Sequence, residues 1–127
     1  MSPRKILLAD ADPGSRELLR LYLERLGCPT PVQAKDGEEA LDKALAEKPD
    51  LIVMEVRLPK LDGFEIVARL RRTPSTRNAQ ILAATASALP EDRKRCLANG
   101  FNGYLAKPFT YQQFGELLRA MLASDID

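Results

Sequence analysis

Short apolar runs alternate along this chain with longer segments in which apolar residues recur at helical spacing. Apolar runs of about 4–8 residues bounded by turn-forming residues are typical of strands. This pattern predicts five strands, at 6–9, 31–34, 51–54, 81–85 and 101–106. Three or four of them are apolar throughout, which indicates strands covered on both faces, whereas the prolines near 31–34 favour an edge position.

A helical segment follows each predicted strand. In the first, Asp12 suits the N-cap and Pro13 suits the first helical position, while Gly27 marks the end. Its apolar face consists of Leu19, Tyr22, Leu23 and Leu26. The other helices are predicted to begin at Asp36, to follow a cap at Asp62, to span 91–99, and to include Phe114 to Met121.

Five strand–helix units in sequence predict an α/β fold, a doubly wound parallel sheet of five strands with five helices, because parallel neighbours need crossover connections. We expect one domain over 1–123, with 124–127 forming a tail or the start of a linker. The chain has 127 residues, of which 45% are hydrophobic and 29% charged, which is the balance of a globular domain of this length.

Charge and residue types exclude several functions. The formal net charge of +1 favours neither nucleic acid nor an anionic membrane, and no apolar run is long enough to span a membrane. With no histidine, His-based catalysis and His-ligated zinc are excluded. Cys28 and Cys96 lie far apart without metal-type spacing, which predicts two reduced thiols in a cytoplasmic protein.

Polar residues stand at the predicted ends of four strands. Asp10, Glu55, Thr85 and Lys107 follow or finish these runs. In an open α/β sheet, ligands bind beyond the carboxyl ends of the strands, so these side chains should converge on one edge. Two carboxylates could hold a divalent cation, and a hydroxyl with an ammonium could bind phosphoryl oxygens. The alternative is a solvated charge cluster in which Asp10 and Asp62 act as loop caps.

From about Lys5 to Met121, the chain resembles the response-regulator receiver domains, of which the chemotaxis response regulator is a single-domain example. The resemblance rests on an ordered set of motifs: Ile6-Leu7-Leu8-Ala9-Asp10, Pro49 to Met54, Leu58-Pro59 with Leu61-Asp62-Gly63-Phe64-Glu65, Ala84-Thr85-Ala86, and Gly103 to Phe109. It implies a flavodoxin-like sheet with strand order 2-1-3-4-5.

In that family, a sensor kinase passes a phosphoryl group to an aspartate after the third strand, and an acidic pair after the first strand binds Mg²⁺. The resemblance implies that Thr85 and Lys107 hold the phosphoryl oxygens. It also implies that Tyr104 is the aromatic residue that switches inward in the phosphorylated state. It implies that the Arg57 backbone carbonyl completes the metal site and that the Lys107–Pro108 bond is cis. Partners would be a sensor histidine kinase or a downstream protein, bound by the fourth helix, fifth strand and fifth helix.

Two positions depart from the family pattern. Glu55 occupies the phosphoacceptor position, and Ala11 replaces the second acidic metal ligand beside Asp10. The added methylene displaces the carboxylate from an attacking position, and misplacement of about 1 Å can cost around a hundredfold in rate. We therefore expect no cofactor, or weak Mg²⁺ binding, and no normal aspartyl phosphorylation. Instead, Glu55 is expected to pair with Lys107 near Thr85.

The sequence predicts a degenerate receiver, a non-enzymatic protein-interaction module that is monomeric or weakly dimeric and binds neither nucleic acid nor membrane. Two alternatives stay open: a receiver that a sensor kinase still phosphorylates in a phosphorelay, and a flavodoxin-like ligand-binding domain. The loop 11–15, with its single glycine, argues against the latter because a phosphate-cradling loop needs several backbone donors.

Overall fold

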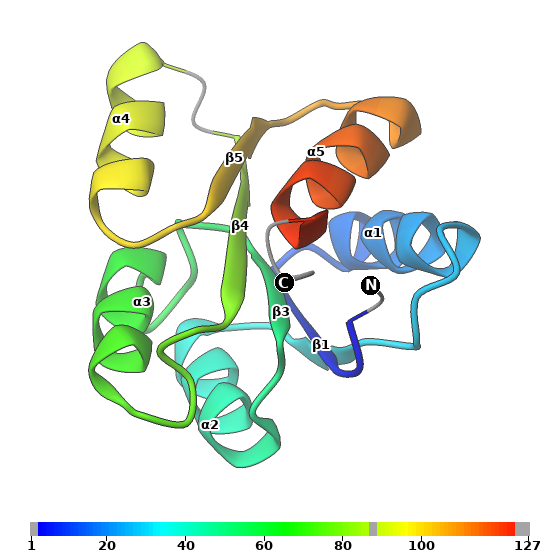
Figure 1. Ribbon diagram of the computed structural model, residues 1–127. Helices are drawn as coiled ribbons and strands as arrows, with labels where there is room; N and C mark the ends of the chain where they lie inside the picture. The colour runs from blue at the N-terminus through cyan, green and yellow to red at the C-terminus, as the bar shows by residue number, and fades with distance from the viewer. Residues whose placement is uncertain (1–2, 87–88, 124–127) are drawn as a thin grey trace.

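Five parallel strands alternate with five helices in the computed structural model, which describes residues 3–86 and 89–123 (Figure 1). The strands are β1 Ile6–Ala9, β2 Val32–Ala34, β3 Leu51–Met54, β4 Gln80–Thr85 and β5 Gly103–Ala106. The helices are α1 Pro13–Arg25, α2 Gly37–Glu47, α3 Gly63–Arg72, α4 Pro90–Ala98 and α5 Tyr111–Ala123. The strand order β2-β1-β3-β4-β5 confirms the predicted fold class. The predicted tail at 124–127 lies outside the described residues.

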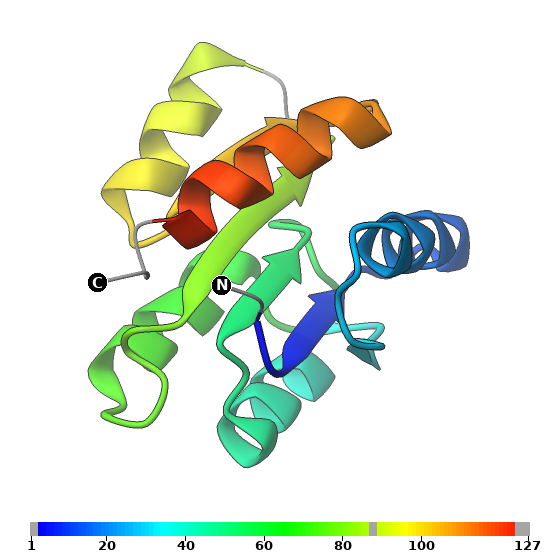
Figure 2. The ribbon, with the colours of Figure 1, turned by 45° about the vertical axis from the view of Figure 1, so that its right-hand side comes forward.

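The helices form two layers, one on each face of the sheet. Helices α1 and α5 lie on one side, and α2, α3 and α4 lie on the other (Figures 1 and 2). Because successive side chains of a strand point to opposite faces, neighbouring rows of side chains across the sheet pack against different helix layers. The row of Leu7, Ile52 and Ile81 packs under α2 and α3, whereas the neighbouring row, Leu8, Val53 and Leu82, packs under α1 and α5. This two-sided burial explains the continuously apolar strands.

Aspartate N-caps set the starts of the first three helices. Asp12 accepts a hydrogen bond from the Ser15 amide at 2.9 Å, and Asp36 accepts one from the Glu39 amide at 2.8 Å. Asp62 makes the same contact at α3, with the amide three residues further on, at 3.0 Å. Each such cap stabilises its helix by about 1 kcal/mol. These caps confirm the helix starts that the sequence predicts.

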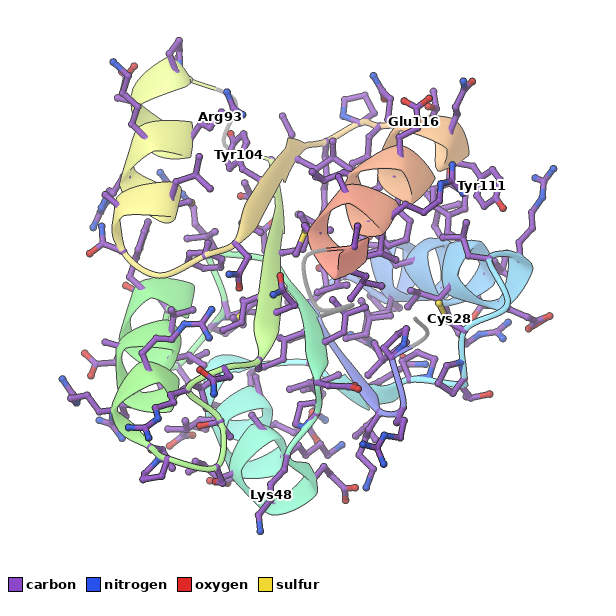
Figure 3. The ribbon with its side chains drawn as sticks, viewed as in Figure 1. Cys28, Lys48, Arg93, Tyr104, Tyr111 and Glu116 are labelled. Atoms are coloured by element: carbon purple, nitrogen blue, oxygen red, sulfur yellow. The ribbon has the colours of Figure 1, made fainter. Side chains whose placement is uncertain are left out.

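Several element boundaries differ from the prediction, most of them by one residue, as at the starts of β2 and β4. Strand β5 begins at Gly103 rather than at residue 101, because the Phe101 amide bonds back to the Cys96 carbonyl and its ring enters the core below α3. Helix α4 begins at Pro90, one residue earlier than expected. Both cysteines are free thiols, as expected: Cys96 is buried on the α4 side, and Cys28 is half-buried beside α1 (Figure 3).

The loop between β3 and α3 packs tightly on the start of α2. The Gly37 amide donates to the Pro59 carbonyl at 2.9 Å, and a Cβ at Gly37 would collide with the Leu61 carbonyl group. The absence of a side chain at this one position therefore lets the loop that carries Glu55 close over α2. Within residues 3–86 and 89–123, no helix is long and apolar enough to cross a lipid bilayer.

Candidate functional site at the carboxyl edge of the sheet

The carboxyl ends of β1, β3, β4 and β5 bring the predicted polar residues together. Strand β1 runs beside β3, β3 beside β4, and β4 beside β5, in parallel register. Asp10 and Glu55 directly follow their strands, Thr85 is the last residue of β4, and Lys107 follows β5. Because the strands are parallel, all four residues emerge at the same edge, as expected from the sequence.

Lys107 joins the two carboxylates. Its ammonium donates to Asp10 Oδ2 at 2.6 Å and to Glu55 Oε1 at 3.3 Å, and lies 3.4 Å from Ser15 Oγ. The side chains of Asp10, Glu55 and Lys107 are 5%, 12% and 21% exposed. Since water is largely excluded, these charges interact more strongly than a surface pair would. The ion pair expected between Glu55 and Lys107 is therefore present, and Asp10 shares it.

Backbone amides surround the Glu55 carboxylate. Oε2 accepts from the amides of Val56, at 2.8 Å, and Arg57, at 3.2 Å, so the side chain folds back over its own loop. Oε1 accepts from the Ala86 amide at 3.3 Å, and the Thr85 hydroxyl also donates to the carboxylate. Together with Lys107, five donors from three strand ends meet one carboxylate.

These contacts shift the pKa values of Glu55 and Lys107. Burial raises the pKa of the Glu55 carboxyl, but hydrogen bonds from Thr85 and Arg57 and the positive charge of Lys107 outweigh burial, so this pKa lies below its ordinary value. Burial lowers the pKa of Lys107, yet its bond to Asp10 and the two negative charges raise it overall. Both groups are therefore ionised at neutral pH.

Asp10 has no acidic partner on its own loop. Its Oδ1 accepts from the Asp12 amide at 2.9 Å, and Ala11 between them supplies no ligand. The Asp12 carboxylate is turned to the start of α1, where it caps Ser15. No group of three potential metal ligands from Asp, Glu, His and Cys is found in the part of the chain that the structure describes. Lys107 contacts both of the carboxylates that a divalent cation would share.

Two other predicted site residues lie further out. Tyr104, on β5, is half-buried and packs on the core cluster under α2–α4, near the start of α4 (Figure 3). Burial, and then the nearby negative charge of Asp92, raise its pKa. Arg57 is exposed, and its backbone amide donates to Glu55. The backbone donors of Val56 and Ala86 were not foreseen, since amides leave no signal in the residue types.

Comparison with known proteins agrees with this fold. The family model of the response regulator receiver domain matches residues 6–119. The chain therefore belongs to the receiver domains of two-component response regulators, whose members are signalling modules.

Individual relatives cover the whole domain. The chain is 41% identical over 119 residues to the alkaline phosphatase synthesis transcriptional regulatory protein PhoP of Bacillus subtilis, covering 94% of this chain but 48% of PhoP, so it spans about half of that relative. It resembles the chemotaxis response regulator CheY4 of Vibrio cholerae, with a TM-score of 0.86, 31% identity, and coverage of 96% and 99% of the two chains.

A third relative holds a metal. The receiver domain of the sensor histidine kinase PA1611 from Pseudomonas aeruginosa PAO1 is similar, with a TM-score of 0.85, 34% identity and coverage of 96% and 99%. That structure has a magnesium ion coordinated in its active-site cleft.

Proposed function

We propose that this chain is a receiver domain in which the Glu55 carboxylate occupies the anion site of the switch, so that signalling proceeds by protein interaction without phosphoryl transfer. The observation that carries the proposal is the donor set around Glu55. A hydroxyl, an ammonium and three backbone amides converge on one carboxylate.

This donor set suits an oxyanion. Backbone amides, a hydroxyl and a lysine are the groups that commonly bind phosphoryl oxygens. A phosphoryl group would need the same donors that the two oxygens of Glu55 already hold. The carboxylate is tethered to the site through its own backbone, which gives it a high effective concentration there. Thr85 and Lys107 are thus assigned to hold the Glu55 anion in place of a phosphoryl group.

The same arrangement opposes phosphorylation. An attacking carboxylate must reach an incoming phosphoryl donor, but that of Glu55 folds back onto the Val56 and Arg57 amides. The metal that would neutralise the donor's charge has one acidic ligand, Asp10, because Ala11 replaces the other, and Lys107 stands between the carboxylates. We therefore assign no cofactor, or weak Mg²⁺ at Asp10 with the Arg57 carbonyl.

The partner in this proposal is a sensor histidine kinase or a downstream signalling protein. The recognition face consists of α4, β5 and α5, with Tyr104 at its centre as the switch residue. We propose a monomer or weak dimer that binds neither nucleic acid nor membrane through this domain, and that catalyses no reaction of its own.

Intact mass after incubation with Mg²⁺ and acetyl phosphate tests the proposal. We expect no added phosphoryl group on the wild-type chain or on Glu55→Asp, and one on the double variant Glu55→Asp with Ala11→Asp, which restores both acidic positions. A wild-type chain that gains a stoichiometric phosphoryl group would refute the proposal. Beryllofluoride titration in the presence of Mg²⁺ gives an independent reading, since it needs the same donors and metal but no phosphoryl transfer.

A further inference from the structure

A cavity of about 280 Å³ lies between α3 and α4, next to the site. Its wall consists of residues from the loop after β3, the start of α3, the end of β4 and one face of α4: Val56, Arg57, Asp62, Phe64, Thr85, Asp92, Arg95 and Cys96. The lining is mixed, with an aromatic ring, aliphatic and thiol groups, and two arginines. Volumes of about 300–1,000 Å³ are usual for ligand sites, so this cavity suits a molecule with a single ring.

The cavity exists because α4 is sparsely packed. Cys96 is the one α4 residue in the buried core, and Leu97 is 42% exposed. The gap to α3 is instead bridged by Arg95, whose guanidinium lies 4.1 Å from the centre of the Phe64 ring. A cation–π contact of this kind holds two surfaces together without filling the space beside them.

The charges that line the cavity balance formally, with two arginines and two aspartates, and the aspartates are engaged in capping contacts. Asp62 accepts from the Glu65 amide at 3.0 Å, and Asp92 accepts from the Leu89 amide at 3.4 Å, so both carboxylates serve the helix starts. The Arg95 guanidinium stacks on a ring and has no carboxylate within ion-pair distance among the described residues. An arginine used in this way can still donate in its plane to a carboxylate.

We propose that this cavity is a binding site for a single-ring aromatic carboxylate. The ligand ring packs beside Phe64 and Cys96, and its carboxylate accepts hydrogen bonds from Arg95 at the rim beside Arg57. The site lies beside the Glu55 donor set, and its wall shares Val56, Arg57 and Thr85 with that set. Binding does not require the proposed role of Glu55. An occupied cavity would change the surroundings of the residues at the end of β4.

Nuclear magnetic resonance titration of the ¹⁵N-labelled full chain with benzoate tests the site, with benzamide and acetate as probes that lack the charge or the ring. At constant ionic strength, we expect saturable shifts of the Phe64, Thr85 and Arg95 amides with benzoate. Benzamide should bind about tenfold more weakly, because it lacks the charge-assisted hydrogen bond. Acetate, without a ring, should also bind more weakly than benzoate.

Three variants locate the binding. Arg95→Gln should weaken benzoate binding about tenfold, and Phe64→Leu should weaken it about threefold, since the aromatic contact is lost. Arg69→Gln is the matched control, because Arg69 is an exposed α3 arginine that pairs with Glu65 at 3.3 Å, away from the cavity lining. Non-saturable shifts, equal binding of benzamide or acetate, or unchanged affinity in Arg95→Gln would overturn the proposal.

Discussion

Replacing Lys107 by methionine tests how strongly the ion cluster holds the strand ends together. Methionine has an unbranched stem of similar length but removes the ammonium that lies 2.6 Å from Asp10 and 3.3 Å from Glu55. Two ionised carboxylates, 5% and 12% exposed, would then face each other without that charge. Both carboxylates keep their backbone donors, so the loss is chiefly electrostatic.

The expected magnitude follows from the burial. Breaking a buried ion pair by removing one partner costs about 3–5 kcal/mol, because the remaining charge is left uncompensated. The Lys107 side chain is 21% exposed, and water can partly solvate the carboxylates, so we expect the lower end, about 3 kcal/mol. With a urea slope near 2 kcal/mol per molar, the unfolding midpoint should fall by about 1.5 M.

Urea unfolding at pH 7, followed by circular dichroism, provides the measurement. The matched control is Lys5→Met, which removes an exposed lysine 3.0 Å from Glu47 and should cost about 0.2–1 kcal/mol. Adding Glu55→Gln to Lys107→Met removes one of the two facing charges, and should recover part of the loss. A Lys107→Met midpoint equal to that of the control, or no recovery in the double variant, would refute the reasoning.

Three further outcomes follow from single contacts. The pKa of Glu55 lies below its ordinary 4.5 in the folded chain. The stability that this carboxylate contributes is therefore present above pH 4.5 and is lost as the pH falls through the folded pKa. The urea midpoint of Glu55→Gln should accordingly depend less on acid pH than that of the wild type. Gly37→Ala should cost about 3 kcal/mol in thermal unfolding, because its Cβ meets the Leu61 carbonyl. Asp36→Ala should cost about 1 kcal/mol through loss of the α2 cap on Glu39, and an unchanged urea midpoint would contradict that role.

Much of the fold was predictable because its signals are local. The run Leu51–Met54 is apolar throughout since it is buried from both sides, and residues of this kind can be identified without knowing their neighbours. Asp12 and Asp62 cap helices through an amide three residues away, which is also a short-range interaction. Phe101 was misassigned to a strand because an apolar residue in a buried turn gives the same signal as a strand residue.

The convergence of Asp10, Glu55, Thr85 and Lys107 was also predictable, since parallel strands end at one edge and each residue stands at a strand end. The amino-acid sequence by itself thus determined the doubly wound α/β architecture and the strand ends at which these residues stand, and its resemblance to receiver domains marked the two departures at Ala11 and Glu55. These properties depend on residue type and on spacing along the chain.

Only the tertiary structure decided how those residues are paired. It directs the carboxylate of Glu55 back to the amides of Val56 and Ala86, and places the ammonium of Lys107 against Asp10, 97 residues away along the chain. It also leaves a cavity under α4, because the packing of one helix depends on neighbours that the helix does not encode. The residue types do not reveal backbone donors or cavities, because these form only when distant segments are brought together.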